Sequence, residues 1–516
     1  MTHQGMNMQD NPAFPESQDG NTTRKRSFRE IMEPMLVLFN VAAEQVLPGK
    51  PYYISYSVPG GVYGHFHDHE VREEELGRIY AGIEKMLRSG ISFTQQPFSK
   101  DALIAHFEKH GRADITHLLR SRENNARALE GLHLAQVNGA GEMFPESVQE
   151  NHEKLLGFKL FKYRKGFFLI ADQDFYQRVM PERIELSKYF RRFEESEDAM
   201  KFLGISSFAE LNDVISQGRL PEFIKIAEAY QARRISRIAD NIISHPLKPR
   251  VIFLAGPTSS GKTTSANRLA IELRVIKKQA LILSLDNYYL PHSEIPDDPE
   301  TGIKNFELIS ALDLGLFMDN IHDLVAGKAI HLPKYHFDGQ GPVPEQKLTS
   351  ITDDTLIIVE GIHGLNPQLW KNVMDLESYR LYVSALTTLN IHDHLPFSTS
   401  DHRLIRRLVR DHLFRGYDFN ETMMRWPDVM QNEYQSIFPF QESANAIFNS
   451  ALIYEIAVFA FYAPQILRPE RAVNPLIRKE AERLNRMLSL LIPINPSDIP
   501  PTSILREFIG GSSFNY

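Results

Sequence analysis

Eight consecutive residues, Gly256 to Thr263 (GPTSSGKT), have the spacing G-x-x-x-x-G-K-[ST] of a loop that binds nucleotide phosphates. The glycines let the backbone curl until successive N–H groups face one anion, and the helix that follows adds its positive end. Lys262 would neutralise the β- and γ-phosphates, and the Thr263 hydroxyl would complete the shell of a Mg²⁺ ion. The predicted nucleotide-binding residues are Gly256, Pro257, Thr258, Ser259, Ser260, Gly261, Lys262, Thr263 and Thr264.

The residues on either side of this loop favour a genuine phosphate site over a fortuitous glycine-rich turn. An apolar run, Val251 to Ala255, precedes the loop, and a helical pattern from Ser265 to Arg274 follows it. The chain has neither the N-K-x-D signature of guanine binding nor the L-S-G-G-Q signature of transport ATPases. We expect ATP as the phosphoryl donor, although the sequence does not separate ATP from GTP.

Two acidic residues end apolar runs that we interpret as strands. Asp286 follows Leu281 to Leu285, and the end of such a strand lies where ligands gather in parallel sheets. There it could accept the proton of a hydroxyl group that attacks the γ-phosphate. Glu360 ends the run Leu356 to Val359 and could bind Mg²⁺ directly or through water. The alternative for both is a capping or turn role.

A cluster of arginines lies between Asp401 and Asp411 and includes Arg403. At helical spacing these side chains make one basic face, which could close over a triphosphate and stabilise the transferring phosphoryl group. A solvated run of charges paired with the two aspartates is the alternative. The predicted catalytic residues are Asp286, Lys262, Arg406, Arg407 and Arg410.

From about residue 250 apolar runs alternate with helical patterns, which predicts an α/β domain with a doubly wound parallel sheet. Upstream we expect two strands at 52–63, a helix at 71–89 and a hairpin at 158–170, followed by mainly helical sequence and a break at 244–249. A buried helix is expected near 451–467 and another helix, without an assigned role, at 471–491. The predicted division is a disordered tail (1–30), an α+β accessory domain (31–200), a helical linker (201–249) and a P-loop kinase domain (250–516).

Composition excludes some classes of site. The 516 residues include no cysteine, so disulfides, thiolate metal sites and cysteine nucleophiles are excluded. A net charge of −8 does not favour a nucleic-acid partner. The most apolar late stretch contains Glu455 and Pro464 and is short for a membrane span. We expect a cytoplasmic protein without a membrane partner, and we leave homo-oligomerisation open.

Taken in order, the motifs resemble the uridine kinase/phosphoribulokinase family over about residues 250–460. The segments that carry the resemblance are the P-loop, Leu285-Asp286-Asn287-Tyr288-Tyr289, Asn305-Phe306-Glu307, Lys334-Tyr335-His336-Phe337-Asp338, Val359-Glu360-Gly361-Ile362 and the arginine cluster. The resemblance implies that Asp286 is the base for a nucleoside 5′-hydroxyl and that the arginines form a lid. It also implies a substrate pocket lined by Tyr288, Tyr335, His336 and Phe337. The histidine that uridine kinases typically place after the equivalent of Phe337 is missing, so base preference stays open.

The chain is similar to a longer bacterial subgroup of nucleoside kinases, in which a region similar to the threonyl-tRNA synthetase editing domain precedes the kinase. The stretches Tyr52–Arg120 and Phe158–Ile170 carry this resemblance, together with Asn366-Pro367, Tyr382–Leu386 and Ile437–Glu442. It implies that the accessory domain has an α+β fold like that editing domain.

The accessory region contains a histidine cluster and a basic cluster. His65, His67 and His69 would share one face of an extended segment and could hold Zn²⁺, but a solvated strand end is the simpler interpretation. The cysteine motif of the synthetase site is impossible here, so editing activity is not expected. The arginines at 120, 122 and 127 could bind RNA, and a solvated surface explains them more simply.

The function predicted from the sequence is transfer of the γ-phosphoryl group of ATP, with Mg²⁺, to the 5′-hydroxyl of uridine or cytidine. One rival is a kinase of the same family that acts on another alcohol, such as a sugar phosphate or pantothenate. The other is a nucleotide-gated RNA-binding or regulatory protein.

Overall fold

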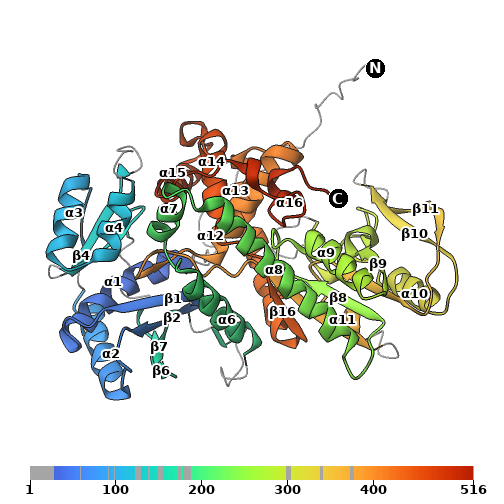
Figure 1. Ribbon diagram of the computed structural model, residues 1–516, viewed down its shortest axis with the longest axis horizontal. Helices are drawn as coiled ribbons and strands as arrows, with labels where there is room; N and C mark the ends of the chain where they lie inside the picture. Colours follow the sequence, from blue (N-terminus) through green and yellow to red (C-terminus); the bar gives the residue numbers. More distant parts are fainter. Residues whose placement is uncertain are drawn as a thin grey trace.

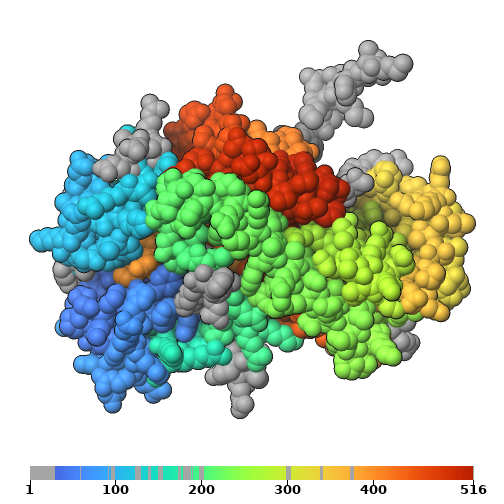
Figure 2. Space-filling view, in the orientation of Figure 1, coloured from blue at the N-terminus to red at the C-terminus, as the bar shows by residue number. Residues whose placement is uncertain are grey.

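The structure is a computed structural model that describes residues 28–58, 60–90, 92–97, 99–122, 129–137, 140–148, 155–172, 176–177, 187–297, 304–336, 341–371 and 377–514. Arg127, Phe337 and nearly all of the predicted tail lie outside these residues. In Figure 1 the N-terminal half, in blue and cyan, lies beside the half that carries the nucleotide loop, in green and yellow. The C-terminal helices, in red, lie across the top of the molecule in this view (Figure 1 and Figure 2).

The described residues of the N-terminal half form two antiparallel sheets and four helices. One sheet has the order β1-β2-β7-β6, formed by β1 (Tyr52–Val58), β2 (Gly61–Phe66), β7 (Gly166–Ile170) and β6 (Lys159–Tyr163). The other has the order β3-β4-β5, formed by β3 (Thr94–Pro97), β4 (His133–Val137) and β5 (Ala140–Phe144). The helices are α1 (Phe28–Val46), α2 (Glu73–Arg88), α3 (Lys100–Lys109) and α4 (Ala113–Ser121). The two strands, the helix and the hairpin expected here are confirmed.

Three helices connect this half to the nucleotide loop: α6 (Lys188–Leu203), α7 (Phe208–Ser216) and α8 (Leu220–Ile243). A capping box begins α7, because the Ser207 hydroxyl accepts from the Glu210 amide while the Glu210 carboxylate accepts from the Ser207 amide. The long helix α8 crosses the middle of the molecule and packs against the helix that follows the P-loop (Figure 1). The predicted break at 244–249 is confirmed as the turn that ends α8.

The nucleotide-binding half is built on a five-stranded sheet whose strands are all parallel, in the order β16-β13-β8-β12-β9. The strands are β8 (Val251–Ala255), β9 (Gln279–Ser284), β12 (Thr355–Glu360), β13 (Ser378–Ser384) and β16 (Ala446–Asn449). Every residue of β8 and β12 is buried, as expected for central strands of a parallel sheet. The predicted parallel α/β sheet is therefore confirmed.

The remaining elements surround this sheet. The helices are α9 (Lys262–Val275), α10 (Leu314–Val325), α11 (Pro367–Trp370), α12 (Thr399–Arg410), α13 (Phe419–Ser436), α14 (Glu455–Ile466), α15 (Pro475–Ser489) and α16 (Arg506–Ile509). Two further pairs of strands are β10 (Ile330–His336) with β11 (Gly341–Thr349), and β14 (Asn390–His392) with β15 (Leu395–Pro396). The expected helix near 451–467 is confirmed as the largely buried α14. Within the described part of the chain, no helix has the length and apolar character needed to span a membrane.

A buried polar network joins the two halves. The guanidinium of Arg112 donates two bonds to Glu142, at 2.8 and 2.9 Å, and two to Asp114, at 2.8 and 3.0 Å. From the other half, His394 Nδ1 lies 2.5 Å from the Glu142 carboxylate, and the ring of His392 contacts Arg112. One hydrophobic core runs through both halves, from Met32 in α1 to Ile509 in α16. The halves therefore pack as a continuous body.

Candidate active site

The phosphate loop follows β8 and leads directly into α9. A Cβ atom at Gly256 would collide with the carbonyl oxygen of Val383, so only glycine fits beside strand β13. Ser259 (φ 60°) and Gly261 (φ 82°) have left-handed backbone conformations, which curl the loop. The Nζ atom of Lys262 donates to the carbonyl oxygen of Pro257 at 3.2 Å. The loop therefore already has the curled form expected of an anion cradle.

Two acids lie beside Lys262 at the carboxyl edge of the sheet. Asp286 is in a 3₁₀ turn (Leu285–Tyr288) directly after β9, and Glu360 is the last residue of the neighbouring strand β12. The strand register pairs Glu360 with Ser284, whose hydroxyl donates to the Glu360 carboxylate at 2.8 Å. Burial lowers the pKa of Lys262, and the charges of Glu360 and Asp286 oppose that shift. The structure thus brings together the lysine and the two acids that the sequence singled out.

The electrostatics of this group show an excess of negative charge. Burial and the neighbouring Asp286 raise the pKa of Glu360 to about 7, although Lys262 and the Ser284 hydroxyl pull it down. Loss of surrounding water also raises the pKa of Asp286, against the opposing charges of Lys262 and Arg415. Two carboxylates this close repel each other, so a cation between them and the phosphates would be stabilised.

A third acid, Glu307, was part of the motif pattern but had no predicted role. Its amide donates to the side-chain oxygen of Asn305 at 2.9 Å, which fixes the turn that carries it. Burial and the charge of Glu433 raise the pKa of Glu307 to about 7, while Arg407 and Lys262 lower it. Glu307 therefore lies close enough to Lys262 and Asp286 for their charges to act on its pKa.

The aromatic side chains next to Asp286 differ from the predicted substrate pocket. Tyr288 is 1% exposed, and its hydroxyl accepts from Asn320 in α10, so it lies in the core beneath the turn. Its neighbour Tyr289 instead meets the rings of Phe306 and Tyr335, with ring centroids 5.5 and 5.7 Å apart. The structure therefore joins Tyr335 to Tyr289 rather than to Tyr288.

The segment around Tyr335 is only partly described. The Tyr335 amide donates to the side-chain oxygen of Asn287 at 3.2 Å, which ties β10 to the turn that carries Asp286. His336 is exposed at the end of β10, and Phe337 lies outside the described residues. Asn287 is a positioning contact that the sequence pattern contained but did not identify.

The predicted basic face is the helix α12, and two of its arginines are fully buried. Arg403 donates to the Thr258 carbonyl oxygen at 3.0 Å and pairs with Glu433. Arg406 donates to the Ser259 carbonyl oxygen at 3.2 Å and pairs with Glu455 at 2.8 Å. These two cations brace the first turn of the P-loop from behind, and their counter-charges are buried carboxylates rather than phosphates.

The other two arginines of α12 are partly exposed. The Nε atom of Arg407 donates to Asp411 at 3.2 Å, and its charge is felt by Glu307. Arg410 Nη2 lies 3.4 Å from the hydroxyl oxygen of Ser259, and burial lowers the pKa of Arg410 to about 10. Arg410 is therefore the partly exposed arginine of α12 that lies beside the loop, whereas Arg407 lies near Glu307.

The C-terminal segment also contacts the loop, which sequence reasoning missed. The carboxylate of Glu507 accepts from the Thr264 amide at 3.1 Å and from the Thr264 hydroxyl at 2.5 Å. A Cβ atom at Gly261 would lie 2.7 Å from the Ile504 side chain, and the Phe508 ring lies under the guanidinium of Arg406. An acidic side chain thus already occupies the N-terminal turn of α9.

Glu433 is a second residue that the sequence did not reveal. Its carboxylate accepts from the Thr258 amide at 2.7 Å and is the partner of Arg403. It lies in the last turn of α13, without any local pattern that would distinguish it from a solvated helix residue. Only the folded chain shows that this carboxylate reaches the P-loop.

Two histidines of the cluster in the N-terminal half have local partners, and the basic cluster has one local and one distant partner. His65 is hydrogen-bonded to Ser55 at 3.1 Å, and His69 to Glu75 at 3.0 Å. Among the described residues, no group of three or more histidine, aspartate or glutamate side chains could hold a metal ion. Of the basic cluster, Arg120 pairs with Glu108, and Arg122 donates to the carbonyl oxygen of Ser489.

Comparison with known proteins agrees with this geometry. Residues 251–457 match the Phosphoribulokinase / Uridine kinase family. Uridine-cytidine kinase B of Dictyostelium discoideum is 29% identical over 210 residues, which cover 40% of this chain and 77% of that protein. Uridine kinase of Brevibacillus brevis is 28% identical over 200 residues, covering 39% and 84% of the two chains, and that of Ureaplasma parvum is 25% identical over 199 residues, covering 38% and 86%. The C-terminal half therefore contains a domain of this family, and the chain is a P-loop kinase.

Proposed function

We propose that this kinase transfers the γ-phosphoryl group of ATP to the 5′-hydroxyl of a pyrimidine nucleoside, uridine or cytidine, giving the nucleoside monophosphate. The observation that carries the proposal is the convergence of Lys262, Asp286 and Glu360 beside the phosphate loop. A protein that only sensed a nucleotide would have no need of an acid at that position. The acceptor class is supported by the names of the relatives, which are uridine and uridine-cytidine kinases.

In this proposal the side chains divide the work of an in-line phosphoryl transfer. The loop amides and Lys262 hold the triphosphate. Asp286 orients the acceptor hydroxyl and accepts its proton, and its raised pKa brings the carboxylate closer to the basicity that this transfer needs. Arg407 and Arg410 balance charge on the transferring group, while buried Arg406 holds the loop in shape from behind.

The proposed acceptor pocket begins at the aromatic cluster next to Asp286. Tyr289, Phe306 and Tyr335 present ring faces and edges on which a base or sugar could rest. Tyr288 would support this surface from the core, and His336 and Phe337 would extend it. This arrangement excludes water from one side of the reacting hydroxyl.

Mg²⁺ is the metal ion that kinases of this type use, and the oxygen-donor set fits it. The Thr263 hydroxyl and the Glu360 carboxylate would hold the ion, since Mg²⁺ binds through one or two protein oxygens together with substrate phosphates. The raised pKa of Glu360, caused by burial and by Asp286, marks a place where a cation would be stabilised. When bound, the ion would neutralise charge on the β- and γ-phosphates.

The central test is Asp286→Asn. Because the amide cannot take up a proton, kcat should fall by roughly two to four orders of magnitude, while ATP affinity stays close to that of the wild type. Turnover is measured with uridine and cytidine, and ATP affinity by titration calorimetry. Near-normal turnover of this variant would show that Asp286 is not the base.

The acceptor itself needs a separate experiment. A panel of nucleosides, sugar phosphates and pantothenate should show the highest kcat/KM for uridine or cytidine. Turnover of another alcohol and of no nucleoside would refute the acceptor class and leave the kinase assignment intact. Asp286→Asn should abolish turnover of whichever acceptor is found.

Further proposals concern the rest of the chain. We propose residues 31–200 as an accessory domain resembling the threonyl-tRNA synthetase editing domain, 201–249 as a helical linker and 250–516 as the kinase domain. We also propose that the protein acts in the cytoplasm, to which its cysteine-free composition is suited.

A further inference from the structure

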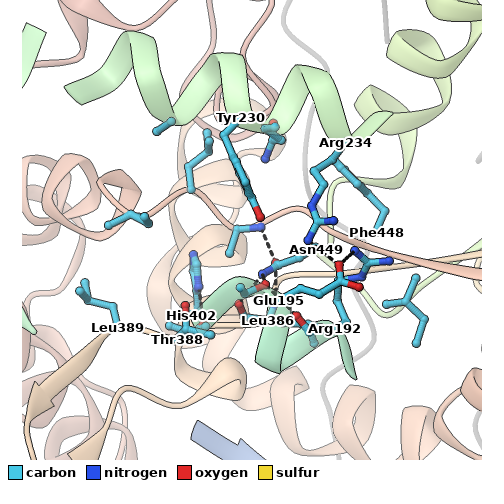
Figure 3. A pocket seen from close by; sticks show the side chains of 18 of the residues that line it. Arg192, Glu195, Tyr230, Arg234, Leu386, Thr388, Leu389, His402, Phe448 and Asn449 are labelled. Atoms are coloured by element: carbon cyan, nitrogen blue, oxygen red, sulfur yellow. Dashed lines mark hydrogen bonds and ion pairs between the residues drawn. The ribbon is translucent and has the colours of Figure 1, made fainter. Parts of the chain in front are cut away.

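A cavity separate from the proposed active site lies where the connecting helices meet the kinase sheet (Figure 3). Helices α6 and α8 form one wall, and the loops that follow β13 and β16 form the other. Its volume is about 250 Å³, and buried apolar side chains such as Leu386, Leu389 and Phe448 line its interior. Lys262, Asp286 and Glu360 are not among the lining residues.

The walls of this cavity carry more positive than negative charge. Three guanidinium groups, those of Arg192, Arg234 and Arg237, line it together with one carboxylate, that of Glu195. Arg192 and Arg234 share that carboxylate, and each has a nitrogen 2.6 Å from the same oxygen atom. One carboxylate does not neutralise three cations, so an additional anion would be stabilised here.

The hydrogen bonding of Arg192 is a second indication that the cavity binds a ligand. Its Nε atom is buried and has no hydrogen-bond partner among the described residues. Burial also lowers the pKa of this guanidinium, against the opposing effect of Glu195. Buried polar groups in proteins are almost always hydrogen-bonded, and an unpartnered one beside a cavity marks a position for a ligand atom or a water molecule.

We propose that this cavity is a binding site for a small organic anion with an aromatic or apolar body, such as an aryl sulfonate, carboxylate or phosphate monoester. The anionic group would meet Arg192 and Arg234, as the view in Figure 3 suggests, and Arg237 would add charge at the exposed edge. The body would lie against the apolar interior and the ring of Tyr230, which already lies under the guanidinium of Arg234.

The cavity is connected to the phosphate loop through two short paths of hydrogen bonds. Gln231, in the wall, donates to the Ser450 carbonyl oxygen at 3.1 Å, and Arg406 donates to the same oxygen at 3.0 Å. His402, also in the wall, pairs with Glu455, the counter-charge of Arg406. Because Arg406 braces Ser259, occupancy of the cavity should change ATP affinity, a consequence that rests on the proposed function.

Binding can be tested without any kinase assay. The fluorescent aryl sulfonate 1-anilinonaphthalene-8-sulfonate is titrated into the full-length protein, where we expect a saturable blue-shifted emission. The double variant Arg192→Met/Arg234→Met should weaken its apparent Kd roughly tenfold or more, because the charge-assisted bonds to the sulfonate are lost. Arg233→Met removes an exposed charge next to Arg234 on α8, outside the cavity, and should leave the Kd unchanged.

Two further measurements keep the inference falsifiable. If the double variant proves unstable, Arg237→Met replaces it in the test. Because Arg237 is exposed, this variant should fold normally, and it should weaken binding of the probe roughly threefold. Lys262→Ala should leave binding of the probe unchanged if the probe occupies the cavity. An equal Kd in the wild type and in the folded arginine variants, or a Kd that rises in Lys262→Ala when no ATP is present, would overturn the proposal.

The coupling is tested last. A saturating concentration of the probe should change the KM for ATP at least twofold in the wild type and in Arg233→Met, and leave it unchanged in Arg192→Met/Arg234→Met. If the probe binds but the KM for ATP does not change, the connection to the P-loop is refuted and the proposed anion site is unaffected. Absence of nucleoside turnover would count against the proposed function only, because binding is read by fluorescence.

Discussion

At the scale of single residues, the charge of Glu507 lies where a phosphate would be expected. Its carboxylate accepts from both the amide and the hydroxyl of Thr264, in the first turn of α9. Backbone N–H groups at a helix N-terminus attract any anion, and they do not distinguish a carboxylate from a phosphate oxygen. If ATP binds to this loop as proposed, it would compete with the Glu507 carboxylate for these groups.

Replacing Glu507 with glutamine should strengthen ATP binding. The amide keeps the shape of the side chain and removes the competing negative charge, so the KM for ATP should fall roughly three- to tenfold. Asp498→Asn, an exposed change in the same C-terminal segment, is the matched control and should have no effect. A KM that rises in Glu507→Gln would mean that the carboxylate assists nucleotide binding.

A second residue-scale prediction concerns Glu307 and pH. Burial and Glu433 raise the folded-state pKa of Glu307 to about 7, above its ordinary value of 4.5. Between these two values the folded state holds the proton more tightly than the unfolded state, so this group makes the protein less stable as pH rises. Glu307→Gln should increase the free energy of unfolding at pH 8 by roughly 1–3 kcal/mol and change it little at pH 4.5.

Urea denaturation at several pH values measures this effect. The slope of stability against pH should become smaller in Glu307→Gln without vanishing, because the pKa values of Glu360 and Asp393 are also raised to about 7. Glu470→Gln, an exposed change, should keep the wild-type slope. An unchanged slope in Glu307→Gln would show that the pKa of the Glu307 carboxyl group is not raised in the folded wild type.

At the scale of elements, helices α12 and α13 hold the P-loop between them. Glu433 of α13 accepts from the Thr258 amide and pairs with Arg403 of α12, which donates to the Thr258 carbonyl oxygen. Both side chains are buried. One residue of the loop is thus fixed through its two backbone groups by an ion pair between two helices.

Glu433→Gln should therefore destabilise the protein by about 3–5 kcal/mol, because it leaves the guanidinium of Arg403 buried without a counter-charge. The KM for ATP should rise as the loop loosens. The double variant Arg403→Met/Glu433→Gln should recover part of the lost stability in chemical denaturation, since no unpaired charge remains. If Arg403→Met/Glu433→Gln is less stable than Glu433→Gln alone, the loss of stability does not come from an unpaired charge on Arg403.

Some elements and contacts of the site could be predicted from the sequence and others could not. The strand, loop and helix around Lys262 were predictable because the apolar periodicity and the glycine spacing are local. Thr258 and Glu433 are 175 residues apart, and no local pattern connects them. Which of Tyr288 and Tyr289 joins the aromatic cluster with Tyr335 depends on the direction of each side chain at a 3₁₀ turn. Two consecutive tyrosines in a sequence do not determine that direction.

At the scale of the whole molecule, the two halves are joined by buried charges as well as by a common core. Arg112 pairs with Glu142 and Asp114 of the same half, and these two carboxylates contact His394 and the Asp393 amide of the other half. The attraction of the two carboxylates outweighs the effect of burial on Arg112 and leaves its pKa raised. Arg112→Met should lower the free energy of unfolding by about 3–5 kcal/mol, because two buried carboxylates lose their counter-charge. Arg78→Met, exposed on α2, should change it little.

The contribution of this network to the contact between the halves is measured by thermal unfolding combined with limited proteolysis. Weakening the junction should let the N-terminal half open first, with early cleavage there while the kinase half stays protected. Equal melting temperatures of Arg112→Met and the wild type would show that the shared hydrophobic core holds the halves together without this network.

The contact of Glu507 with Thr264 also has a consequence for the order in which the chain acquires its structure during synthesis. The two residues are 243 positions apart, so the phosphate loop leaves the ribosome long before the segment that covers it. At translation rates of 5–20 residues per second, this interval is roughly 10 to 50 s. During that time the Glu507 carboxylate cannot contact Thr264. The sheet is complete once β16 has emerged, so in the last part of this interval a nascent chain with a folded sheet could bind nucleotide before Glu507 is made.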